Sequence, residues 1–172
     1  MFMISLAILF LSGMSHNSTR DASKLLPNTD DWNRNNMSLS PAQKIKLIDY
    51  WQKSSANDLK TASDIISKTS RYSGGLFFLY LSLEKKLKAL YVHKFGLQAP
   101  FSHNLLSLAE KCELVTSSSR EVVLTEINEY NLESRYPDDK FSLDKLATKK
   151  FSELQLKNAK EILKWISLNF KN

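Results

Sequence analysis

The pattern that most constrains this chain is a helical repeat of apolar residues between Ser40 and Thr69. Apolar side chains recur there at steps of three or four positions, the period of one face of an α-helix. They are Ile45, Ile48, Trp51, Leu59, Ala62 and Ile66. Ser40 is a favourable N-cap and Pro41 suits the first helical position. The segment therefore predicts one long helix, from about Pro41 to Thr69, with a stripe facing a core.

Two further helices are expected in the next part of the chain. The sequence from Ser70 to Gly75 predicts a turn, and Leu76 to Phe95 then predicts a second helix that stops at Gly96. Ser102 is a suitable cap for a short third helix that ends near Cys112 or Leu114. On the second helix, Glu84 and Lys88 have the spacing of an i,i+4 ion pair on a charged face.

The remainder of the chain predicts two more helices, each introduced by a capping box. Ser118 with Glu121 begins the fourth helix, and Ser152 with Gln155 begins the last. The fourth helix must end near Tyr136, because Pro137 disfavours helical geometry in the residue before it. Arg135 and Tyr136 are thus expected at a helix end.

Composition supports an all-α fold, an up-and-down bundle of four to five helices. The chain has 172 residues, 42% of them hydrophobic, and only four Gly and four Pro, so long helices with few tight turns are favoured. The lone Cys112 cannot form an intramolecular disulfide and is expected to be buried. No cluster of Cys and His suggests a metal site.

The first 37 residues are expected to lie outside the bundle. Residues 2–11 are apolar but too few for a membrane span, and a weak signal peptide or a true start at Met14 would each explain them. Residues 14–37 are polar and predict a flexible arm. We therefore divide the chain into 1–37, apolar start and arm, and 38–172, the bundle, and we expect a cytoplasmic protein that does not bind membranes.

Four stretches in order resemble the HEPN domain family, the higher eukaryote and prokaryote nucleotide-binding domain. They are WQKSSANDLKTA at 51–62, LSLEKKLKAL at 81–90, APFSHNLL at 99–106 and ESRYPD at 133–138. The resemblance implies a helical bundle that commonly dimerises, with functions from nucleotide binding to RNA cleavage. It also implies, as for many bacterial members, a small nucleotidyltransferase as partner in a toxin–antitoxin or defence-type system.

The family's nuclease chemistry lacks a residue in this chain. RNA-cleaving members carry an Arg followed four to six residues later by a His, whereas no histidine follows His103 here. Tyr136 titrates near pH 10 and is a poor base at neutral pH. The sequence thus favours a non-enzymatic role, and His103 is the one weak candidate for a catalytic residue.

We predict a ligand-binding site made of Arg135, Tyr136, Lys88, Lys85 and Glu84. Arg135 would hold a phosphate by a bidentate contact, Tyr136 would pack against a base or ribose, and the lysines would add positive charge. The net charge of +6 favours a nucleotide, RNA or an acidic protein surface as ligand. No metal and no cofactor other than a bound nucleotide is expected.

Three alternatives stay open. Arg135 could instead pair with Glu84 or Glu133 and close its helix end, which would make the segment structural. The chain could be a metal-independent ribonuclease that uses Arg135 and His103. It could also be a purely structural adaptor that only binds other proteins. Separately from these alternatives, we expect a homodimer.

Overall fold

The described part of the chain is helical throughout. The computed structural model describes residues 38–133 and 143–171. Its helices are α2 (Pro41–Lys68), α3 (Tyr72–Phe95), α4 (Leu105–Lys111), α5 (Ser118–Glu133) and α7 (Lys149–Leu168). Within these ranges the only β-type pairing is an isolated bridge between Ser38 and Leu97. The predicted all-α class is confirmed, and the arm predicted for residues 1–37 lies outside the described residues.

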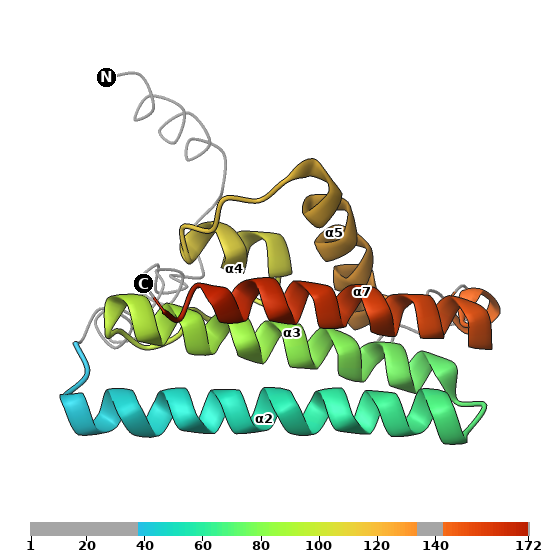
Figure 1. Ribbon diagram of the computed structural model, residues 1–172, viewed down its shortest axis with the longest axis horizontal. Coiled ribbons are helices and arrows are strands. Elements are labelled where there is room, and N and C mark those ends of the chain that lie inside the picture. The colour runs from blue at the N-terminus through green and yellow to red at the C-terminus, as the bar shows by residue number, and fades with distance from the viewer. Residues whose placement is uncertain (1–37, 134–142, 172) are drawn as a thin grey trace, which may run out of the picture. The chain divides into compact units, whose positions relative to one another are not determined.

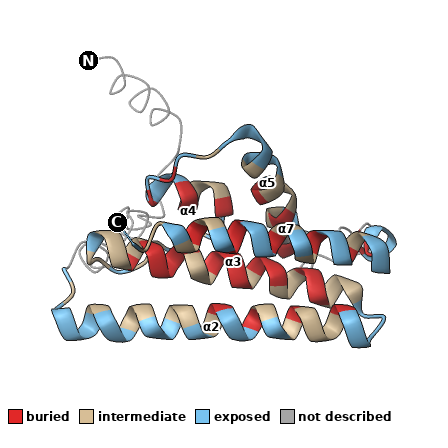
Figure 2. Ribbon diagram, viewed as in Figure 1, coloured by how far each residue is buried: buried red, intermediate tan, exposed pale blue. Residues whose placement is uncertain are grey.

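Helix α3 is the centre of the bundle. It packs against α2, α4, α5 and α7, and Figure 1 shows α2, α3 and α7 side by side, with α4 and α5 above α3. Because neighbours surround it, α3 is apolar on most of its circumference, as expected for a helix inside a core. Figure 2 shows buried residues along its whole length, and Tyr80, Leu83 and Leu87 are fully buried.

The predicted first helix is confirmed at both ends. The Ser40 hydroxyl accepts a hydrogen bond from the Gln43 amide, and the Gln43 side chain accepts one from the Ser40 amide. This reciprocal capping box satisfies two helix-end donors. At the other end, the amide of Thr69 donates to the Ile65 carbonyl and closes α2.

The turn predicted at Ser70 to Gly75 is shorter than expected. Helix α3 already begins at Tyr72, so Gly74 and Gly75 lie in its first turn. A Cβ atom placed on Gly75 would lie 2.6 Å from Cγ1 of Ile66 on α2. Gly75 is therefore needed for the close approach of two helices, and the prediction that Gly74-Gly75 forms a turn is wrong. The stop at Gly96 is confirmed, with φ of 65°.

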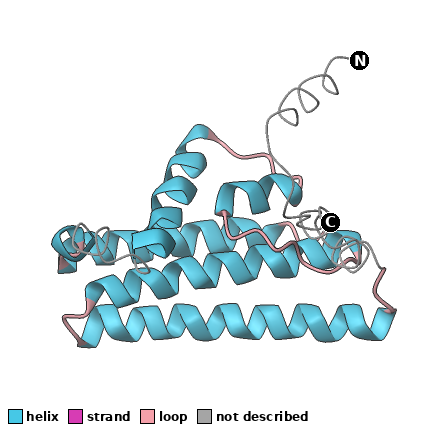
Figure 3. Ribbon diagram, turned by 180° about the vertical axis from the view of Figure 1, so that it is seen from behind, coloured by secondary structure: helices cyan, strands magenta, loops and turns pink. Residues whose placement is uncertain are grey.

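Two predicted caps are replaced by neighbouring residues. Asn104, not Ser102, caps α4 by accepting from the Ser107 amide at 2.8 Å. Thr148 caps α7, which starts earlier than predicted, and this shift places Ser152 and Gln155 on the buried face of the helix. The Glu121 carboxylate accepts from the Thr116 hydroxyl at 2.6 Å. Figure 3 shows the loops that carry these caps.

Cys112 is buried as predicted, after the end of α4. Its thiol donates to the Leu87 carbonyl at 3.4 Å, and burial raises its pKa to about 12. None of the described helices combines the length and the apolar content that a membrane span requires.

Candidate functional site

A row of polar side chains crosses the apolar centre of α3. Tyr80, Glu84 and Lys88 are spaced four residues apart, so they lie one above another on one face of the helix. The Tyr80 hydroxyl lies 2.6 Å from Oε2 of Glu84, and the Lys88 ammonium donates to Oε1 at 2.6 Å. His103, just before the cap of α4, places Nδ1 3.2 Å from the same Oε1. We call these four residues the Glu84 cluster.

The Glu84 cluster is buried except at one edge. Glu84 is 6% exposed and Lys88 is 7% exposed, whereas the His103 side chain is 57% exposed. The expectation of an ion pair on a charged, solvated face is therefore wrong: the pair forms, but inside the bundle. It lies inside because His103, in the segment before α4, and Trp51 of α2 pack against this side of α3.

The carboxyl group of Glu84 is held in its charged form. Burial by itself would raise its pKa, but hydrogen bonds from Lys88 and Tyr80, together with the Lys88 charge, bring the pKa below its ordinary value of 4.5. Its two oxygens already accept from three side chains. A further ion pair to Glu84, such as the alternative predicted for Arg135, would have to compete with these donors.

Two other contacts fix the surroundings of the cluster. The Tyr80 hydroxyl lies 2.8 Å from the carbonyl oxygen of His103, which ties the segment before α4 to α3. The Lys88 ammonium also lies over the ring of Trp51 on α2, 5.5 Å from its centroid, a cation–π contact. The cluster thus joins α2, α3 and the start of α4.

Lys85 belongs to a different set of contacts. Its ammonium lies 2.6 Å from the buried carboxylate of Asp58 on α2. Nearby, the Ser55 hydroxyl donates to the Ser82 carbonyl at 2.7 Å, and the Ser82 hydroxyl donates to the Ser55 carbonyl at 3.0 Å. These bonds link α2 to α3, and within the described ranges no hydrogen bond joins Lys85 to the Glu84 cluster.

Of the residues predicted for the site, the structure brings together Glu84, Lys88 and His103. Arg135 and Tyr136 lie outside the described residues. Tyr80 was not predicted as a site residue, although a signal existed: polar residues at positions 80, 84 and 88 follow a strict four-residue step inside an otherwise apolar helix.

The contact between Glu84 and His103 has chemical consequences. A carboxylate beside Nδ1 favours the imidazole tautomer that carries its proton there, and this leaves Nε2 as an acceptor. Since the His103 side chain is exposed, a ligand can approach Nε2 from solvent. In the described ranges no group of three or more His, Cys, Asp or Glu is placed to hold a metal ion.

Comparison with known proteins agrees with this helical core. The HEPN domain model matches residues 48–169, which include the whole Glu84 cluster. The chain belongs to the HEPN domain family. The crystal structure of TT1696 from Thermus thermophilus has a similar fold, with a TM-score of 0.61 and 20% identity, over 71% of this HEPN chain and 97% of TT1696. No curated protein sequence matches the chain.

Proposed function

We propose that this HEPN domain binds a nucleotide or another phosphate-bearing ligand at the exposed edge of the Glu84 cluster. The observation that carries the proposal is a buried network of charges with one exposed member, His103. A buried ion pair contributes little net stability compared with apolar residues of similar size. Perturbed ionisable groups at a surface opening are, in contrast, common at functional sites.

The residues of the cluster suit a phosphate in a specific way. A phosphate beside His103 favours the protonated imidazole, in which both ring nitrogens donate hydrogen bonds. Glu84 would accept one of these bonds and the phosphate the other. Arg135 would add a bidentate contact, and Tyr136 would pack against the base or ribose.

Calorimetric titration with adenine and guanine nucleotides tests this site. His103→Ala and Arg135→Ala should each abolish binding. Arg71→Ala is the matched control, because Arg71 is an exposed arginine at the N-terminal cap of α3 and does not belong to the Glu84 cluster. Unchanged affinity in both site variants would show that the ligand, if any, binds elsewhere.

We further propose that the domain acts with a nucleotidyltransferase partner, in a toxin–antitoxin or defence-type system, and that it forms a homodimer. Co-purification of the tagged chain from its own host, with the neighbouring genes intact, tests the partner. Recovery of the chain alone would contradict this part of the proposal. The mass in solution tests the dimer.

The contact between Glu84 and His103 also favours a second function, metal-independent RNA cleavage. Nε2 of His103 would take the proton of a ribose 2′-hydroxyl as its oxygen attacks phosphorus, and Arg135 would stabilise the charge that develops on the phosphate. The bond from phosphorus to the 5′-oxygen would break, and the departing 5′-oxygen would take a proton from water, which leaves a 2′,3′-cyclic phosphate and a 5′-hydroxyl. A cleavage assay on structured RNA, with His103→Ala and Glu84→Gln, tests this alternative. Cleavage that survives His103→Ala would exclude it.

A further inference from the structure

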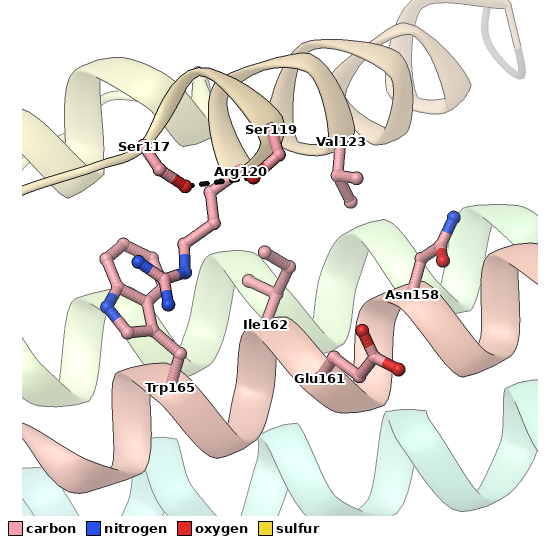
Figure 4. Close-up of a pocket in the computed structure, with 8 residues that line it drawn as sticks. All are labelled: Ser117, Ser119, Arg120, Val123, Asn158, Glu161, Ile162 and Trp165. Carbon is pink, nitrogen blue, oxygen red and sulfur yellow. Dashed lines mark hydrogen bonds between the residues drawn. The ribbon is translucent and has the colours of Figure 1, made fainter.

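A cleft opens between the start of α5 and the middle of α7, away from the Glu84 cluster. Its volume is about 280 Å³. Figure 4 shows Arg120 and Val123 on the α5 side, with Asn158, Glu161, Ile162 and Trp165 on the α7 side. This volume is just below the range of roughly 300–1,000 Å³ for small-molecule pockets. It suits a single planar ring system.

The Arg120 side chain lies in the cleft, and no described residue accepts a hydrogen bond from its guanidinium. Its guanidinium carbon lies 4.9 Å from the centroid of the Trp165 ring. Among the described residues it makes no ion pair and no side-chain hydrogen bond. A guanidinium has five donors in a flat fork, so Arg120 offers both a planar face and donors to a ligand.

The other end of the cleft offers acceptors. Glu161 makes no ion pair with any described residue, and Figure 4 shows its carboxylate on the same side as Asn158. The Asn158 amide nitrogen donates to Gln155 at 3.4 Å, which leaves its carbonyl oxygen available. Val123 and Ile162 provide apolar surface between the two ends. A planar group with an edge of N–H donors, such as a nucleobase with an exocyclic amino group, matches this arrangement.

Positive charge continues from the cleft along the outer face of α7. Lys157, Lys160 and Lys164 line a shallow groove together with Leu156, Glu153 and Glu161, and Glu161 also lines the cleft. The three lysines are spaced i, i+3 and i+7, so they follow one side of the helix over about 10 Å. None of the three makes an ion pair within the described ranges.

We propose that the cleft between α5 and α7 binds one base of a single-stranded nucleic acid whose phosphates lie along Lys157, Lys160 and Lys164. Single strands are bound by basic tracks beside platforms on which bases stack. The Trp165–Arg120 contact supplies the platform, and Glu161 with Asn158 reads the donor edge of the base. This surface shares no residue with the Glu84 cluster, so the two proposals can fail independently.

Fluorescence anisotropy with labelled homopolymers of about ten nucleotides, as RNA and as DNA, tests the basic track. The triple variant Lys157→Ala, Lys160→Ala, Lys164→Ala should weaken binding about thirty-fold and reduce the slope of log affinity against log salt by about 2. The matched control changes three exposed lysines of α2, Lys46, Lys53 and Lys60, to Ala and should bind as the unchanged chain does. The proposal would be overturned if the two triple variants lost affinity equally. It would also be overturned if the unchanged chain did not bind the strands at about 50 mM salt.

Two single variants test the cleft itself. Arg120→Ala should weaken binding of every homopolymer about ten-fold, the size of one lost stacking contact. Glu161→Gln should keep the affinity for uridine strands but lower the preference for cytidine and adenosine over uridine. The proposal is wrong if Glu161→Gln leaves this order of preference unchanged, or if a free mononucleotide displaces the labelled strand at the same concentration as an unlabelled strand does. A comparison of RNA with DNA shows whether the 2′-hydroxyl contributes.

Discussion

The Lys88 ammonium and the Glu84 carboxylate lie 2.6 Å apart, one turn from each other, with less than a tenth of either side chain exposed. The same i,i+4 spacing occurs in α2 between Asp49 and Lys53, at 2.7 Å, but there both side chains are exposed. One helical spacing therefore produces two pairs that differ in their surroundings. This difference allows a direct test of what burial does to an ion pair.

Replacing Lys88 with Met should lower the free energy of unfolding by about 3 to 5 kcal/mol, because the Glu84 carboxylate would stay buried without its cation. Lys53→Met, the matched control on α2, should lower it by less than about 1 kcal/mol. Chemical denaturation measures both. The double variant Glu84→Gln, Lys88→Met should recover part of the loss, since it removes both buried charges. Equal effects of the two single substitutions would contradict the buried pair.

Acid should destabilise the protein partly through Glu84. Its pKa is lowered on folding, so the unfolded chain takes up the proton at a higher pH than the folded chain does. The stability that Glu84 contributes is complete above the unfolded pKa, and it falls as the pH drops from about 4.5 through the lower folded value. Melting temperatures from pH 6 down to about pH 3 should fall less steeply in Glu84→Gln. An identical slope in the variant would show that Glu84 is not held ionised by the fold.

Gly74 and Gly75 offer a matched pair of substitutions in the first turn of α3. A Cβ at Gly74 meets nothing within 4 Å, while one at Gly75 would meet Ile66. Gly74→Ala should stabilise the protein by up to about 1 kcal/mol through helix propensity. Gly75→Ala should destabilise it by about 1 to 3 kcal/mol through overpacking, and adding Ile66→Val should restore part of this loss. If Gly75→Ala also stabilises, the helices do not approach as closely as described.

These pairs show which features can be predicted from the sequence and which cannot. The ends of α2 depend on local signals, the Ser40 cap and the break after Lys68, so they were predicted correctly. In the sequence, Gly75 is compatible with a turn or with a close helix crossing, and only the position of Ile66 on the neighbouring helix decides between the two. The burial of Glu84 and Lys88 likewise depends on contacts with His103 and with Trp51 of α2, which their spacing does not reveal.

In the candidate sites, too, contacts between residues far apart in the sequence could not be predicted. His103 meets Glu84 across 19 residues, and Arg120 meets Trp165 from a different helix. Neither contact follows from periodicity, because it depends on how α4, α5 and α7 pack against α3. The sequence therefore identified residue types with the right chemistry, such as His103 and Lys88, but not the partners that give them a defined environment.

Cys112 provides a probe of the packing that covers the Glu84 cluster. Its thiol is buried after α4, donates to Leu87 on α3, and has a pKa of about 12. Thiols react as thiolates, so the folded chain should react with a disulfide reagent at pH 8 far more slowly than the unfolded chain does. The rate should then follow opening of the α3–α4 contact.

Leu108→Ala, which removes a fully buried α4 side chain, should speed labelling more than Leu154→Ala, which truncates an exposed side chain of α7. Rapid labelling of the unchanged folded chain would show that α4 does not hold Cys112 in the core.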